Sequence, residues 1–281
     1  MLTLTSVEMN TWIAALLWPL TRILGMLAAA PLFGHSSFPA SGKVALGVLL
    51  AMIIAPVVPA LPAADPLSMA GLLILLQEML VGLAMGFSMR IVFAAVEMAG
   101  EAASATMGLG FASVFDPQTR GRSAAVSQFL VLIATLAFLS VNGHLILLEA
   151  LGESFVTLPI SATPMSVNLP LQLAKWGGVI FSVGLQLSLP IVAALLITNV
   201  ALGILTRAAP QLNIFGIGFP VSLGVGLILI SQTLPYLNAP LQTFFNQGIE
   251  TMRSLPRAGA VRTPPTLPAP VPALSPVGAA Q

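Results

Sequence analysis

The chain has 281 residues, of which 57% are hydrophobic and only 7% are charged, and its formal net charge is +1. Soluble globular domains carry about 25% charged residues, so most of the surface of this chain cannot face water. The ten Lys and Arg residues are too scattered to form a face that binds nucleic acid, and the absence of cysteine excludes disulfides and thiol chemistry.

The N-terminal part, residues 1–10, contains Glu8 but no Lys or Arg. A secretory signal peptide begins with a basic region, so we expect the first apolar segment to belong to the mature protein. Six apolar segments occur along the chain, and each is predicted to be helical. They span residues 12–30, 44–61, 67–100, 124–151, 173–206 and 212–237.

Two of these segments, 67–100 and 173–206, are too long for a simple membrane span. A helix of about 34 residues is roughly 50 Å long, whereas the hydrocarbon core of a bilayer is about 30 Å thick. Each is therefore predicted to be kinked, broken or extended beyond the bilayer. Pro190 is the expected break in the second, because proline removes a helical hydrogen bond. In the first, Gly82 and Gly86 have the spacing of closely packed helices, although such a pair also arises by chance in glycine-rich helices.

Charged residues interrupt or border the apolar segments at a few positions. At about 100° per residue, Arg90, Glu97 and Glu101 lie within an arc of roughly 40° on one helix face. A charge at the centre of a bilayer costs at least about 2.5–3.5 kcal/mol, so this face is predicted to contact protein or water. It is either a buried ion-pair seam between subunits or an ion or proton path. We favour the seam because transporters usually repeat such charges on several helices. Arg22 and Glu78 are the other charges of this kind.

The sequence contains no pattern typical of catalysis or metal binding. His35 and His144 are the only histidines, and neither belongs to an HExxH motif or a carboxylate-rich cluster. A Gly-x-Ser-x-Gly motif and a glycine-rich phosphate loop are also missing. We therefore predict no enzyme activity, no cofactor and no metal.

The orientation of the chain in the membrane is not predicted by the positive-inside rule, because Lys and Arg are divided equally between the alternating loops.

A loop of unusual composition, residues 107–122, separates the third and fourth segments. Ordinary connections are short and polar, whereas this one places apolar side chains on a glycine-rich backbone. It is either a movable loop that packs into a cavity or a hydrophobic re-entrant connector, and composition alone does not decide between them. The residues that we single out are Met107, Gly108, Gly110, Phe111, Phe115, Asp116 and Pro117.

Three runs of sequence resemble the FliR family, the flagellar members of the type III secretion export-gate proteins, whose injectisome relatives are the SctT proteins. They are MGLGFASVFDP at 107–117, NGH at 142–144 and RAAPQLNIFGIGFP at 207–220. The resemblance covers about residues 8–250 in unbroken order. The matching positions outside the loop are Asn142, Gly143, His144, Arg207, Pro210, Gln211, Phe215, Gly218 and Pro220.

The resemblance implies an all-α, membrane-type protein with long, kinked or broken helices that forms part of a helical export-gate ring. The ring would be a conduit for unfolded flagellar substrates in the flagellar basal body of the bacterial inner membrane, largely on its periplasmic side. Residues 107–122 would be a plug loop, with Phe111 and Phe115 as apolar stoppers. The implied partners are FliP-like, FliQ-like and FlhB-like subunits, a rod or FliE-like protein, and the exported substrates.

The composition divides the chain into two parts. Residues 1–253 are predicted to form the helical domain. Residues 254–281, which are rich in Pro and Ala, are predicted to form a disordered tail, to which we assign no role.

The main alternative function is a secondary transporter with a charged site at Arg90, Glu97 and Glu101. A membrane enzyme is a weaker rival, because the sequence shows no catalytic constellation.

Overall fold

The computed structural model describes residues 6–59, 61–62, 64–111, 125–163, 168–209 and 214–259, and all regular structure in these ranges is helical. This confirms the predicted all-α fold. Five helical segments in the described part are long and apolar enough to cross a membrane, or six if one bent pair counts as a span. The helices are α1 (Ser6–Ala29), α2 (Ala40–Ile54), α3 (Met69–Thr106), α5 (Ala125–Ser140), α6 (Gly143–Thr157), α7 (Asn168–Gly177), α8 (Val179–Ala208), α9 (Ile214–Thr233) and α10 (Asn238–Gly259).

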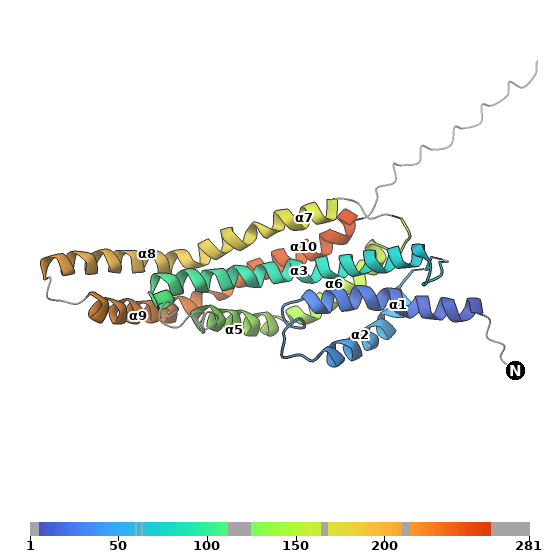
Figure 1. The fold of residues 1–281 in the computed structure, drawn as a ribbon, viewed down its shortest axis with the longest axis horizontal. Helices are drawn as coiled ribbons and strands as arrows, with labels where there is room; N and C mark the ends of the chain where they lie inside the picture. The colour runs from blue at the N-terminus through green and yellow to red at the C-terminus, as the bar shows by residue number, and fades with distance from the viewer. Residues whose placement is uncertain are drawn as a thin grey trace, which may run out of the picture.

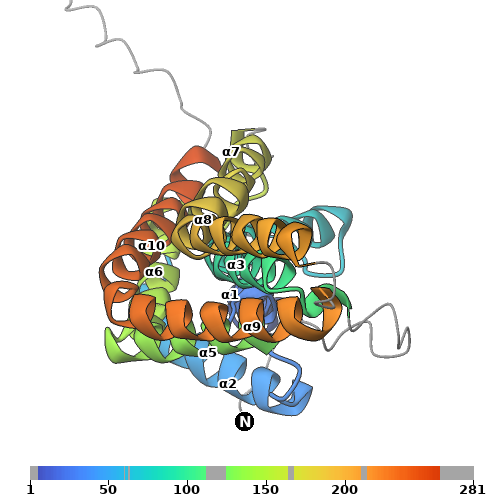
Figure 2. The same cartoon turned by 90° about the vertical axis from the view of Figure 1, so that its left-hand side faces the viewer.

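Helix α3 is the central element of the fold. It runs along most of the long axis of the molecule (Figure 1) and has 38 residues, which corresponds to about 57 Å. In the end view, α8, α10, α6 and α5 form an arc with α3 on its inner side (Figure 2). Of the three options predicted for this segment, the structure shows a continuous helix. It is therefore longer than a bilayer core of about 30 Å, and part of it extends beyond that core unless it tilts strongly.

The predicted break at Pro190 is wrong. This proline lies inside α8, and the chain breaks instead at Gly178, between α7 and α8. A proline removes one backbone hydrogen bond, and the surrounding turns continue the helix. Two consecutive glycines, Gly177 and Gly178, lower helix propensity at adjacent positions and mark the actual break.

The segment 124–151, predicted as one apolar helix, is two helices that meet at a corner. The axes of α5 and α6 differ by 67°. Asn142 occupies the left-handed region at the corner, with φ of 55°, a conformation that Asn tolerates better than most residues. A Cβ on Gly143 would overlap the ring of Phe138. That ring lies 5.7 Å from Phe93 of α3 and 5.2 Å from Phe245 of α10, so the corner positions an aromatic contact between three helices.

Helix α10 extends past the predicted boundary of the helical domain at 253. It continues to Gly259, and both Leu255 and Pro256 are buried in it. Residues 260–281 lie outside the described ranges. The helix is amphipathic, and its buried side chains recur at helical spacing. They include Leu241, Phe244, Phe245, Ile249, Met252 and Leu255.

The glycines of α3 allow α1 to pack closely against it. A Cβ on Gly86 would lie 2.5 Å from the Met26 carbonyl oxygen, and one on Gly82 would overlap the Arg22 carbonyl oxygen. On α1, a Cβ on Gly25 would lie 2.8 Å from the Met79 carbonyl oxygen. The Gly82–Gly86 spacing therefore mediates close packing within the chain rather than arising by chance.

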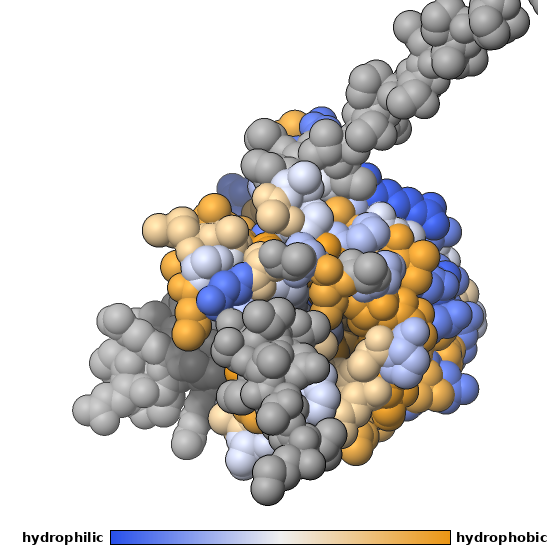
Figure 3. Space-filling view, turned by 90° about the vertical axis from the view of Figure 1, so that its right-hand side faces the viewer, coloured by the Kyte–Doolittle hydropathy of each residue, from blue (hydrophilic) through white to orange (hydrophobic). Residues whose placement is uncertain are grey.

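The surface of the single chain is largely apolar. Ile197 on α8 and Ile228 on α9 are 72% and 63% exposed. Figure 3 shows apolar side chains over much of the end of the molecule where α1 begins, with hydrophilic ones gathered along one flank. A surface of this kind requires lipid or other subunits to cover it.

Candidate functional site

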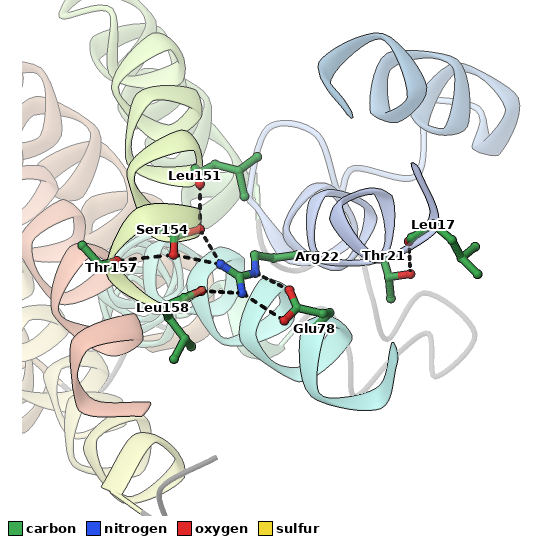
Figure 4. Close-up of polar contacts among 8 residues, drawn as sticks. All are labelled: Leu17, Thr21, Arg22, Glu78, Leu151, Ser154, Thr157 and Leu158. Carbon is green, nitrogen blue, oxygen red and sulfur yellow. Dashed lines mark hydrogen bonds and ion pairs between the residues drawn. The ribbon is translucent and has the colours of Figure 1, made fainter. Parts of the chain in front are cut away.

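A charged cluster lies in the core where α1, α3 and the end of α6 meet (Figure 4). Its centre is Arg22, which is fully buried one turn after the buried Trp18 of α1. The opposite charge comes from Glu78 of α3, which is 1% exposed. Charged residues are almost never buried to this degree without a partner.

The Arg22 guanidinium makes a two-point contact with Glu78. Arg22 Nε donates to Glu78 Oε2 at 2.6 Å, and Arg22 Nη2 donates to Glu78 Oε1 at 3.0 Å. This paired geometry matches the planar fork of a guanidinium to the two oxygens of a carboxylate, and it is among the stronger polar contacts in proteins. Arginine is therefore not interchangeable with lysine at this position.

The remaining donors of Arg22 reach the end of α6. Arg22 Nη1 donates to Ser154 O at 2.9 Å and to Ser154 Oγ at 3.2 Å, and Nη2 donates to Leu158 O at 2.9 Å. The C-terminus of a helix carries a partial negative charge, which a cation offsets. The Ser154 carbonyl also accepts from Leu158 N at 2.9 Å, so Arg22 adds a second donor to it. The Phe155 ring centroid lies 4.4 Å from Arg22 Cζ and adds a cation–π contact.

The cluster is a clamp between three segments that are distant in sequence. Its five hydrogen bonds match the five N–H groups of one guanidinium. No donor of Arg22 is left over for a ligand. Within the part of the chain that the structure describes, no three His, Cys, Asp or Glu side chains come together as a metal site.

The predicted seam residues lie on α3, away from this cluster. Arg90, Glu97 and Glu101 are all exposed on the single chain, and none forms an ion pair among the described residues. The expected burial of these side chains is therefore not present within one chain. The buried ion pair of the described core is Arg22–Glu78 instead.

The described part of the predicted plug loop is a tight turn at the end of α3. Met107 is fully buried, and Gly108 has φ of 84°, a conformation that favours glycine. Residues 109–111 form a short 3₁₀ turn. Phe115, Asp116 and Pro117 lie outside the described residues, as does the side chain of Phe111.

The residues that carried the family resemblance are distributed over three places. Asn142 and Gly143 form the α5–α6 corner, and the Nδ1 atom of His144 beside them is buried without a hydrogen-bond partner among the described residues. Arg207 is exposed in the last turn of α8, where a cation complements the helix dipole. Gly218 and Pro220 lie in α9, as does the backbone of Phe215, whereas Pro210 and Gln211 lie outside the described ranges.

Sequence reasoning identified both members of the buried pair as unusual charges but did not pair them. They are 56 positions apart, and the carbonyls that complete the cluster leave no signal in residue type. The available signal was that two opposite charges interrupt two apolar segments, each without a nearby partner in its own helix.

The chain is similar to known proteins over most of its length. Residues 13–248 match a family described as bacterial export proteins, family 1. The flagellar biosynthetic protein FliR of Pectobacterium carotovorum subsp. carotovorum is 40% identical over 255 residues, which cover 91% of this chain and 97% of that protein. FliR of Escherichia coli (strain K12) is 39% identical over 249 residues, which cover 88% of this chain and 94% of that protein. FliR of Bacillus subtilis (strain 168) is 33% identical over 237 residues, which cover 83% of this chain and 91% of that protein.

Proposed function

Because this chain belongs to the FliR family of flagellar biosynthetic proteins, within the bacterial export proteins, family 1, we propose that it is a subunit of a flagellar protein-export apparatus in the bacterial inner membrane. The family match over residues 13–248 carries this proposal. The prediction that the chain is not an enzyme agrees with membership in a family of export proteins.

The finer proposal is a gate subunit in a helical ring with FliP-like and FliQ-like subunits, contacting an FlhB-like subunit and a rod or FliE-like protein. Two features support it. The chain exposes apolar side chains on α2, α8 and α9, which other helices or lipid would cover. The α3 helix is longer than a bilayer core, which suits an assembly that projects from the membrane.

Deletion of the gene tests this function. We expect cells without the chain to lose swimming and secretion of flagellar substrates, and the restored chain to recover both. A tagged chain should copurify with FliP-like and FliQ-like proteins. Normal swimming of the deletion strain, or a tagged chain that is stable alone and active as a transporter, would contradict the proposal. The transporter alternative places its charged site at Arg90, Glu97 and Glu101, and the same copurification experiment separates it from the export function.

Residues 107–122 serve as the plug of the pore in this proposal. The buried Met107 and the turn at Gly108 anchor the start of the segment to the end of α3. Burying a phenylalanine contributes roughly 1.5–3 kcal/mol, so Phe111 and Phe115 together could hold a segment closed by several kcal/mol. A translocating chain could still displace a contact of that strength.

Removing the central part of the plug should make the membrane leaky. We expect deletion of residues 110–115 to leave the complex assembled, because this segment follows the anchor at Met107, and to let small ions cross the inner membrane. Conductance or dye entry in cells that make the complex measures this, with assembly checked in parallel. A deletion that assembles fully and stays as tight as wild type would show that the segment is only a connector.

The exposed charges of α3 form the inter-subunit seam in this proposal. Glu97 and Glu101 are one turn apart, and the small residue Ala105 continues the same exposed stripe. A neighbouring helix with basic residues would complement them. Burial of a charge costs several kcal/mol unless it is paired. The seam would therefore favour a neighbouring helix with basic residues over one without them.

Replacing Glu97 by Leu should reduce the amount of assembled complex, because it leaves the positive charge of Arg90 in the buried seam without its negative counterpart. We expect the double change Arg90→Leu with Glu97→Leu to recover part of the loss. Glu149→Leu is the matched control, since Glu149 is exposed on α6 in a surface pair with Arg253, and such pairs contribute about 0–1 kcal/mol. Assembly is measured by native gel of the purified complex. Normal assembly of Glu97→Leu with abolished secretion would favour an ion path instead.

A further inference from the structure

Three methionines at intervals of nine positions, two in α3 and one at its C-cap, each pack against a glycine of a different helix in the C-terminal half. A Cβ added to any of these glycines would lie within 2.9 Å of the methionine side chain, so each methionine occupies the space beside its glycine. The pairs are Met89 with Gly248 of α10, Met98 with Gly184 of α8, and Met107 with Gly226 of α9.

The third pair is reinforced by polar contacts that the other two do not share. Asn199 Nδ2 of α8 donates to Thr106 O at 3.4 Å, and Ser222 Oγ of α9 donates to Asn199 Oδ1 at 2.8 Å. Thr106 O is one of the last four carbonyls of α3, the group that helices leave without internal donors. Ser222 and Gly226 are one turn apart and both buried on α9, so both face the end of α3 and α8.

Helix α9 is the least buried of the membrane-length helices in the described part of the single chain. Of its most apolar residues 17% are buried, against 28% for the α7–α8 stretch and 67% for α3. Pro220 lies inside the helix and Pro235 in the 3₁₀ turn that follows it, and Gly224 adds to the low helix propensity. Methionine side chains adapt to altered contacts more readily than branched ones, and the 3.4 Å hydrogen bond is long.

We propose that the Met107–Gly226 contact and the Asn199–Ser222 pair form a releasable joint between α3 and α9, which opens while a substrate is exported. This α3–α9 joint rests on the proposed export function. The Met98–Gly184 contact belongs to the extensive α3–α8 packing and stays closed. The joint is a positioning device: it holds the end of α3 in place, and the residues that form it need not touch substrate.

Cysteine cross-linking tests the joint directly, because the chain contains no cysteine of its own. One variant carries Met107→Cys with Gly226→Cys, and the matched control carries Met98→Cys with Gly184→Cys, which links α3 to α8 through the same residue types. Both are made in cells that assemble the complete apparatus. We expect both pairs to cross-link on oxidation. Secretion should stop in the first variant and return on reduction, while the control secretes as before.

Several outcomes would overturn the proposal. Full cross-linking at positions 107 and 226 with undiminished secretion would show that the contact is static. A pair that does not cross-link would show that the contact does not form. If the double variant does not accumulate, Met107→Ala replaces it. Met107→Ala removes the side chain that packs against Gly226, so we expect it to loosen the joint and to increase ion leak across the membrane. An ion leak equal to that of wild type would contradict the proposal. Failure of the wild-type gene to restore swimming would refute the export function itself, a separate result.

Discussion

Replacing Arg22 by Met is expected to prevent stable accumulation of the protein. Glu78 would remain 1% exposed without its partner, and the carbonyls of Ser154 and Leu158 would lose a donor. Removing one member of a buried ion pair typically costs about 3–5 kcal/mol. Because whole domains are stable by only about 5–15 kcal/mol, this loss should be visible as a lower level of protein in the membrane and a lower Tm of the purified complex.

Two further variants separate the charge effect from the loss of packing. Arg22→Met combined with Glu78→Leu should recover part of the stability, because no buried charge is left unpaired. Arg253→Met is the matched surface control: its pairs with Glu149 and Glu153 are partly exposed, so a change of about 1 kcal/mol or less is expected. If Arg22→Met were as stable as Arg253→Met, the buried cluster would have no role in holding the three segments together.

Long apolar runs made most of the helices predictable. The segments beginning near residues 12, 44, 67 and 212 each correspond to a helix of the structure, with ends shifted by one to seven residues. A continuous apolar run is a strong signal because it has few alternatives to a buried or lipid-facing helix. The same criterion cannot place breaks inside a run, which explains why the corner at Asn142 and the break at Gly178 were not predicted.

Helix α10 was missed because it is not apolar overall. Its buried residues nevertheless recur at spacings of three and four, from Leu241 to Leu255, and a search for that periodicity would have found the helix.

For the charged residues, local features were predictable and contacts between distant segments were not. Helical spacing predicts that Arg90, Glu97 and Glu101 share one face of α3, an inference that needs only local geometry, and all three are exposed in the structure. The partner of Arg22 depends on how three distant segments pack, which spacing along one helix does not reveal.

Replacing Gly82 by Ala is expected to destabilise the protein although only one methyl group is added. The new Cβ would overlap the Arg22 carbonyl oxygen of α1, and because that atom belongs to the backbone, the overlap is relieved only if α1 moves away from α3. Overpacking in a core costs about 1–3 kcal/mol, occasionally more. The control is Gly203→Ala in α8, where no atom lies within 4 Å of the added Cβ, and where alanine should be neutral or stabilise by roughly 0.5–1 kcal/mol.

The two variants with large effects should also be coupled. Gly82 lies one helical turn after Glu78, and it faces the backbone of the residue that pairs with Glu78. Moving α1 away therefore lengthens the Arg22–Glu78 contacts at the same time. Combining Gly82→Ala with Arg22→Met should lower Tm by less than the sum of the single effects, because contacting residues are not additive. Full additivity in the double variant would show that helix packing and the ion pair act independently. If Gly82→Ala were as stable as Gly203→Ala, α1 and α3 could move apart without loss of stability.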